Sequence, residues 1–541
     1  MTTGPPRSVT DKLQPERRRA MTRLAVRQVR RGALIVAAAC AAMSTWVASQ
    51  YRPIGNMLDE SGLQALAENS AVRVLSGPPV ALDDPGGFTV WRTGTPVALL
   101  ASVWIIFAAT HLTRGEEDEG RWELLLAGRL RMADIVVRCL AALAASAALI
   151  GMAVAMGLLA ARAEVTGTLI YAGGITCTTL TFAAAAVLAA QTVPWRSGAI
   201  GLTTAVLGLA LALRMIADGS HRFAWFAWAT PFGLTTRAAP YAENRILPLF
   251  VLIAFPLALG GAAVVAAHRR DLGGGIVAAP VSRPPRTRLF GSVEGFALQR
   301  TARSMLWWTT GIAAYFFVAG ALLASILDLV ETQPRFKELA AATGTGGDNL
   351  ANAFAAALFG VLAIATGLYA TMRFATMVGD EKAGRWALVL AQPIARIRLF
   401  SAETAVITAG VAALHCSAAV ALWCGAMMTG APVQLAHALA GSTTFVPVAL
   451  LAVGAAAVGV GWFPSAVGTL GALPLVIGYL MNVAVQTTNP PGWVADLSPW
   501  THLTASPDKP VDGLATGILL LIGVCLTALG AYGFVGRDTA N

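Results

Sequence analysis

Twelve apolar runs, each long enough to cross a lipid bilayer, constrain the fold of this chain more than any other feature. A spanning helix needs about 20 apolar residues. The runs lie near 32–50, 95–113, 134–160, 166–191, 198–217 and 246–267, and near 305–328, 350–373, 402–428, 435–462, 465–485 and 513–535. In lipid each run has to be helical, because backbone groups there have no water to bond. The sequence therefore predicts an all-α polytopic membrane protein with twelve transmembrane helices.

The composition excludes the common soluble classes. Charged residues make up 13% of the 541 residues and apolar residues 56%, whereas soluble proteins carry about 25% charged residues. A soluble enzyme, a disordered scaffold and a coiled coil are therefore ruled out. All six cysteines fall inside apolar runs and none forms a C-x-x-C pair, so neither a disulfide framework nor a metal site is predicted.

The charge pattern predicts the orientation in the membrane. The formal net charge is +10, and the basic residues cluster at the ends of the apolar runs. Positive residues near membrane spans stay on the cytoplasmic side. Most Lys and Arg are cytoplasmic when the N-terminus is inside, and twelve spans then place both termini inside. Topology thus explains the basic residues better than nucleic-acid binding does.

The chain contains an internal repeat. Residues 115–127 read GEEDEGRWELLLA and residues 379–391 read GDEKAGRWALVLA, with eight of 13 positions identical. The two copies follow the second and the eighth span, and LAVRQVRR and FALQRTAR precede the first and the seventh. Because six is an even number, the halves are predicted to be parallel repeats. We expect six-helix halves at 1–268 and 292–541, joined by a flexible cytoplasmic linker over 269–291.

The repeated segment is the candidate functional site. Acidic residues at its start favour a helix N-terminus, and a Trp beside an Arg and short apolar residues is typical of an exposed interface anchor. The candidate docking residues are Glu117, Gly120, Arg121, Trp122 and Leu124, and Glu381, Gly384, Arg385, Trp386 and Leu388. The alternative is a membrane-parallel helix that only turns the chain, because Trp is common at the interface.

These segments, the six-plus-six layout and the basic stretches before spans one and seven resemble the permease of ABC-2 type exporters, in the group of tetronasin-type or multidrug efflux permeases of actinobacteria. The resemblance implies coupling helices at about 115–130 and 379–394, and elbow helices at about 15–31 and 292–304. The second copy departs from the first, since Lys382 replaces Asp118 and Pro393 replaces Arg129.

The resemblance also implies a function and partners. A bacterial plasma-membrane permease of this kind exports hydrophobic or amphipathic compounds such as drugs, antibiotics or lipids. The chain has no Gly-Lys pair and so no P-loop for nucleotide phosphates. We therefore expect no enzymatic activity and no cofactor in this chain; two copies of a separate ATPase subunit would bind ATP and Mg.

In the resembled family the second and fifth spans of each half line the route. The residues in this position are Trp104, Phe107, Arg214, Phe354, Phe359, Tyr479 and Asn482. Lipid-facing or packing roles are an equal alternative for each. Arg214 stands well inside a span, where charge is costly and usually faces a cavity or a partner, although its long side chain could also snorkel to the outer surface.

Two other classes of protein remain open. A proton- or sodium-driven secondary transporter also suits twelve spans, but it needs ionisable residues in mid-membrane, where Asp and Glu are nearly absent. A membrane transferase acting on lipid-linked substrates needs carboxylates or a metal pair at the interface. The dense acidic cluster 116–119 is already explained by the repeat.

Overall fold

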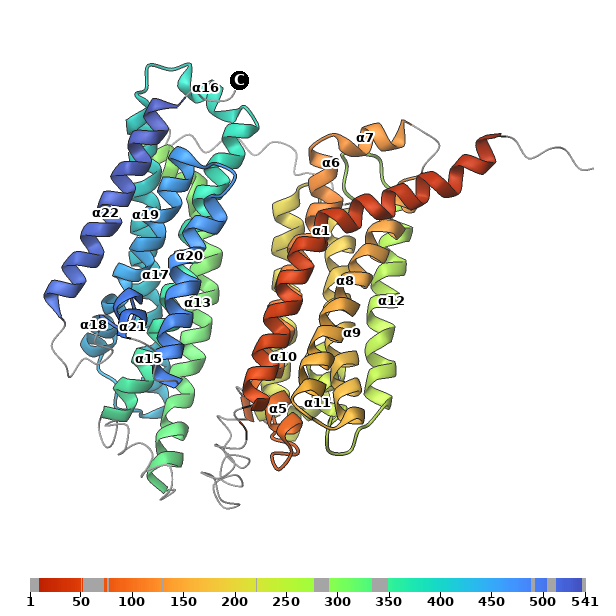
Figure 1. The fold of residues 1–541 in the computed structure, drawn as a ribbon, viewed down its shortest axis with the longest axis horizontal. Coiled ribbons are helices and arrows are strands. Elements are labelled where there is room, and N and C mark those ends of the chain that lie inside the picture. Colours follow the sequence, from red (N-terminus) through yellow and green to blue (C-terminus); the bar gives the residue numbers. More distant parts are fainter. Residues whose placement is uncertain are drawn as a thin grey trace, which may run out of the picture. The chain divides into compact units, whose positions relative to one another are not determined.

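The computed structural model describes most of the chain as helix, in two compact units, Met1–Arg283 and Pro284–Asn541. The described residues are 9–49, 51, 73–74, 77–127, 131–219, 221–276, 291–332, 349–487, 492–503 and 512–537. Within them every regular element is helical, as Figure 1 shows for each unit. The division between the units falls inside the residues 269–291.

The first unit is a bundle of long helices connected by short ones. Its elements are α1 (Val9–Ser49), α5 (Pro85–Thr110), the π-helix η1 (His111–Gly115), α6 (Glu116–Asp118), α7 (Arg121–Leu126), α8 (Met132–Ala160), α9 (Val165–Thr192), α10 (Arg196–Gly219), the 3₁₀-helix η2 (His221–Ala229), α11 (Pro231–Arg237) and α12 (Leu247–His268). Helix α9 packs against α5, α8 and α12, and α1 packs against α8.

The second unit has a similar order of elements. These are α13 (Val293–Thr332), α15 (Asn349–Lys382), α16 (Arg385–Leu390), α17 (Arg396–Thr429), α18 (Leu435–Thr444), α19 (Val446–Trp462), α20 (Val467–Thr487), α21 (Gly492–Leu497) and α22 (Gly513–Gly536). Glycines allow α13 and α17 to touch. A Cβ on Gly320 would lie 2.1 Å from the Leu422 carbonyl oxygen, and one on Gly425 would lie 2.0 Å from that of Phe317. Small residues at such crossings give helices close contact in lipid.

The predicted membrane spans agree with the helices. Eleven helices among the described residues are long and apolar enough to cross a membrane. Each coincides with one of the predicted runs, and α18 and α19 together form the run near 435–462. The run near 465–485 corresponds to α20, whose described apolar part, Val467–Tyr479, is shorter than a span. The all-helical membrane fold is thus confirmed, with eleven supported spans in the described part of the chain.

The connecting segments add detail to two expectations. The residues expected as elbow helices, 15–31 and 292–304, lie within the long helices α1 and α13, and Figure 1 shows the first part of α1 bent away from the rest of that helix. The start of the expected flexible linker is packed on the first unit: Arg270 is 9% exposed, and Ile276 donates its backbone N–H to the Gln191 carbonyl. Buried polar partners, described below, hold this segment.

Candidate functional site

The two copies of the repeat form the same turn, which we call the GRW turn (residues 115–127 and 379–391). In each copy a long helix ends and a glycine reverses the chain. Gly120 has φ 73° and Gly384 has φ 70°, which is the left-handed region that glycine enters without a steric cost. A six-residue helix follows, α7 or α16. Within the ranges predicted as coupling helices, 115–130 and 379–394, the structure thus places a glycine turn followed by a short helix.

The tryptophans of the turns are buried, so the prediction that they are exposed is wrong. Trp122 is 1% and Trp386 is 4% exposed. The Trp386 indole N–H donates to the Met377 carbonyl oxygen at 2.8 Å, and the Arg300 guanidinium lies 4.6 Å from the ring centroid. A buried indole removes a large apolar surface from water and so stabilises the packing of its bundle. The indoles therefore anchor the turns to their own bundles.

Other residues of the GRW turns face outward. Leu124 is 80% exposed, and the side chains of Arg121 and Arg385 are 46% and 73% exposed. The Leu388 side chain lies outside the described part of the chain. Hydrogen bonding to Glu116 raises the pKa of the Arg121 guanidinium.

The first acidic residue of each turn binds the first long helix of its unit. Glu116 accepts a pair of hydrogen bonds from Arg121 at 2.6 and 2.5 Å and one from Gln28 of α1 at 3.1 Å. Asp380 likewise pairs with Arg385 at 2.6 Å and with Arg300 of α13 at 2.5 Å. Gln28 and Arg300 hold the same place in LAVRQVRR and FALQRTAR, so the weaker sequence echo has a structural counterpart.

The second acidic residue of each turn binds the arginine that follows the last long helix of its unit. Glu117 accepts two parallel hydrogen bonds from Arg270, both at 2.7 Å. Glu381 pairs with Arg537, the residue directly after α22. Each GRW turn is therefore attached to the first and the last long helix of its own unit, as Figure 1 shows for α6 beside α1 and for α16 beside the end of α22.

The pair in the first unit is the more deeply buried of the two. The Arg270 and Glu117 side chains are 2% and 3% exposed, and Arg114 contributes a second buried guanidinium 3.1 Å from Glu117. The backbone N–H of Gly273 also donates to Glu117 at 2.8 Å. In the second unit the Arg537 side chain is 21% exposed. Removing one partner of a buried ion pair is costly because the other charge stays unpaired.

Sequence reasoning missed the arginines that hold the turns. Arg270 and Arg537 lie in the first two residues after the last long helix of their units. Their shared place in the repeat is the signal that could have identified them. The Gly-rich run from Gly273 contributes to the same cluster: the Gly274 carbonyl accepts hydrogen bonds from Arg114 at 2.8 Å and from Arg270 at 2.9 Å.

The residues predicted to line a route differ in their burial within each unit. Phe359 is fully buried and stacks on Phe316, with ring centroids 5.5 Å apart. Phe107 is 37% exposed. Trp104, Phe354, Tyr479 and Asn482 are half-buried, and Tyr479 packs edge-on against Trp500. Arg214 lines a cavity in the first unit.

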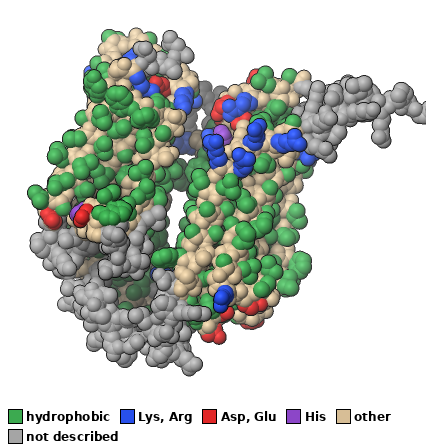
Figure 2. All heavy atoms as spheres, viewed as in Figure 1, with side chains coloured by type: hydrophobic (Ala, Val, Ile, Leu, Met, Phe, Trp, Pro, Cys, Tyr) green, Lys and Arg blue, Asp and Glu red, His purple; other side chains and the backbone are tan. Residues whose placement is uncertain are grey.

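The surface around the turns is basic in the first unit and grooved in the second. Arg23, Arg27, Arg30 and Arg31 of α1 are exposed, and Figure 2 shows Lys and Arg gathered at this end of the unit, above flanks that are largely hydrophobic. In the second unit an open groove of about 440 Å³ lies beside α16, between Val389 and Ile394 on one side and Phe296 on the other. The arginines of α1 flank Gln28, which is bonded to Glu116, and the groove includes Val389 of α16.

The eleven apolar helices and the comparisons with known proteins define the class of this chain as a multi-pass membrane protein related to efflux permeases. Residues 290–535 match the family described as the C-terminal domain of the multidrug efflux system permease Rv1217c. The chain is 27% identical over 479 residues to the multidrug efflux system permease protein Rv1217c of Mycobacterium tuberculosis (strain ATCC 25618 / H37Rv). That alignment covers 88% of this chain and 86% of that protein. These similarities support a membrane efflux permease.

Proposed function

We propose that this chain is the permease subunit of an ATP-driven exporter of the ABC-2 type, powered by two copies of a separate ATPase that dock on the two GRW turns. The main support for this proposal is that each turn is bound to the first and the last long helix of its unit. Glu116 and Glu117 make these contacts in the first unit, and Asp380 and Glu381 make them in the second. A force applied at the turn is therefore transmitted to both helices. The chain lacks a P-loop of its own, which is consistent with a separate motor.

The buried and exposed residues of the turns divide the work. The acidic residues and tryptophans fix the turn to the bundle, and the outward residues contact the ATPase. In the first unit these contacts are Arg121 and Leu124. In the second they are Arg385 and the groove beside Val389 and Ile394. The two docking surfaces differ, so the two ATPase copies bind unequal sites.

The orientation and the cargo follow from the same proposal. The GRW turns and the arginines of α1 face the cytoplasm of a bacterial cell, in agreement with the tendency of basic residues to stay inside. The membrane-spanning helices provide the route for hydrophobic or amphipathic compounds. Binding and hydrolysis of ATP shift the population of two states of this route, and the ligand is released from the state that binds it less well.

Cysteine cross-linking tests the docking sites. Leu124→Cys and Ala387→Cys, made in a variant without native cysteines, place thiols on exposed positions of α7 and α16. Both should form cross-links to a co-expressed ABC ATPase in membranes. Trp225→Cys is the matched control, because it is 61% exposed but lies on η2, away from the GRW turn. Equal cross-linking to the ATPase at all three positions, or no cross-linking at the two turn positions, contradicts the proposal.

Energy coupling separates the proposal from the secondary-transporter alternative. Export from inverted vesicles should require ATP and the ATPase subunit, and it should persist when the proton and sodium gradients are collapsed. An ATPase with its catalytic Glu replaced by Gln serves as the matched negative control. Export that follows the ion gradient with ATP held constant would assign the chain to the secondary transporters instead.

A further inference from the structure

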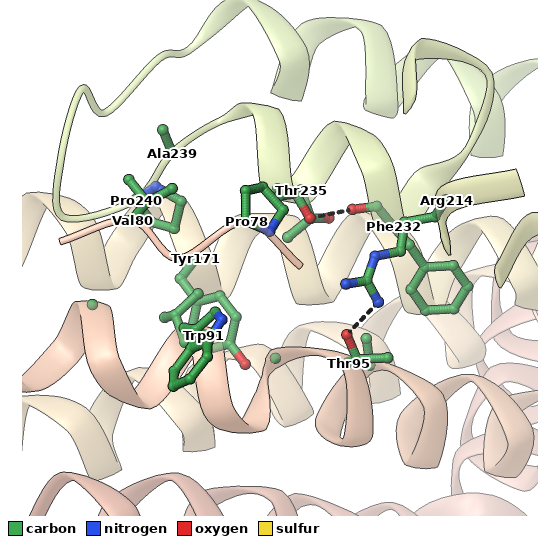
Figure 3. A pocket seen from close by; sticks show the side chains of 15 residues that line it. Pro78, Val80, Trp91, Thr95, Tyr171, Arg214, Phe232, Thr235, Ala239 and Pro240 are labelled. Atoms are coloured by element: carbon green, nitrogen blue, oxygen red, sulfur yellow. Dashed lines mark hydrogen bonds between the residues drawn. The ribbon is translucent and has the colours of Figure 1, made fainter. Parts of the chain in front are cut away.

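A small cavity lies in the first unit at the end of the bundle opposite the GRW turn. Its volume is about 60 Å³, and its lining comes from α5, α9, α10, α11 and the segment before α5. Figure 3 shows Trp91, Thr95, Tyr171, Arg214 and Phe232 around it. Aromatic walls with one buried charge are the usual composition of a ligand site.

The Arg214 guanidinium has one nitrogen left for a ligand. Its Nε donates to Asp218 at 2.5 Å and its Nη1 to Thr95 at 2.9 Å. Its Nη2 is buried and finds no acceptor among the described residues. Gly77 has φ 93°, and a Cβ at this position would lie 2.7 Å from Nη2. The absence of a side chain on Gly77 therefore leaves space for this nitrogen. A buried N–H without an acceptor is costly, and a ligand would remove that cost.

Arg214 is the charged residue in the lining of the cavity. Its Nε forms an ion pair with Asp218 at 2.5 Å. Two other acidic residues at this end, Asp84 and Glu164, accept backbone N–H groups at the starts of α5 and α9. The unused N–H donor of Arg214 needs an acceptor, which an anion supplies and an ammonium cation does not.

We propose that Arg214 Nη2 and the Thr95 hydroxyl bind the anionic group, carboxylate or phosphate, of an amphipathic ligand. Thr95 accepts from Arg214 and can still donate its own proton. The cavity has room for a few water molecules, so it takes the head group and leaves the apolar tail outside. The inference names the substrate class for the proposed exporter, and to that extent it rests on the proposed function.

The charged site belongs to the first half of the repeat. The segments TPFGLT (230–235) and SPWTHL (498–503) are related by an offset of 268 residues. The same offset places the neutral Asn482 where Arg214 stands. Only one of these two related positions carries a charge, which predicts that one anionic group is bound per permease.

Binding to the purified chain in detergent, without any ATPase, tests the inference. The probe is 2-bromododecanoate, whose bromine lies beside its carboxylate and quenches the nearby Trp91. The part of the quenching that is lost in the Trp91→Phe variant comes from Trp91 and therefore reports binding in this cavity. Dodecanoate and dodecyl phosphate should displace the probe, and dodecylammonium, with the same tail, should not. If dodecylammonium displaced the probe as well as dodecanoate does, the inference would be overturned. This test uses the wild-type protein and needs no substitution at Arg214.

Variants locate the anion. The double variant Arg214→Gln with Asp218→Asn removes the charge without leaving a lone carboxylate, and it should lower the affinity for dodecanoate at least about tenfold. Thr95→Val keeps the Arg214–Asp218 pair and should lower the affinity for dodecanoate severalfold. Arg222→Gln is the control, because Arg222 is exposed on η2 at the same end and should change nothing. Unchanged affinity in the first two variants, or an equal loss in the control, overturns the site.

The source of the anion is decided by competition. Lysophosphatidylglycerol that displaces the probe at lower concentration than dodecanoate assigns the site to a lipid head group, and the reverse order assigns it to a carboxylate amphiphile. The two proposals also fail separately. Intact anion binding with no cross-linking at the GRW turns refutes the exporter mechanism alone, whereas cross-linking without anion selectivity refutes only this site.

Discussion

The unequal burial of the two acidic clamps predicts unequal costs when each is broken. Glu117→Gln leaves the Arg114 and Arg270 guanidinium groups, at 0% and 2% side-chain exposure, without a carboxylate. Loss of one partner of a buried ion pair costs about 3–5 kcal/mol. Glu381→Gln removes the partner of Arg537, whose side chain is 21% exposed and can be hydrated in part. We expect a smaller cost there, about 1.5–3 kcal/mol.

The assay is equilibrium unfolding in mixed micelles at increasing SDS fraction, followed by circular dichroism. Glu117→Gln should lower the free energy of unfolding more than Glu381→Gln does. Arg270→Gln completes a double-mutant cycle, in which residues in direct contact give non-additive effects of about 0.5–3 kcal/mol. Equal costs in the two units, or strictly additive effects of Glu117→Gln and Arg270→Gln, would refute the reasoning from burial.

Three further predictions concern single positions. Gly120→Ala and Gly384→Ala should each cost about 1–2 kcal/mol, from left-handed backbone strain, because no side chain obstructs either Cβ; the shift in Tm measures this, and no shift would mean that the turn relaxes. Trp386→Phe should cost about 1–3 kcal/mol, since the Met377 carbonyl loses its donor; unchanged SDS unfolding would contradict this. The backbone N–H of Gly167 lowers the pKa of Glu164 below its usual 4.5, so its carboxylate stabilises α9 at neutral pH and ceases to do so as the pH falls through the lowered pKa. The Tm difference between the wild type and Glu164→Ala should therefore close below pH 4.5, and a gap that widens in acid would contradict the capping.

The membrane spans could be predicted because their cause is local. A run of about 20 apolar residues has no stable place in water, and its backbone has to be helical in lipid, so the helices coincide with the runs in the sequence. The GRW turns could be found for a similar reason. Gly120 and Gly384 hold a left-handed conformation that other residues rarely adopt, and the repeat marks both positions.

The partners of the turns were decided by the tertiary structure. Glu117 meets Arg270 across 153 residues and Glu381 meets Arg537 across 156, and hydropathy carries no information about which charges meet. The same limit explains the error about the tryptophans. An indole beside an arginine suits an exposed anchor as well as a buried one, and the packing of each bundle buried both. Whether Arg214 snorkels or lines a cavity was likewise settled by Asp218 and Thr95, which only the packing of α10 and α5 brings within its reach.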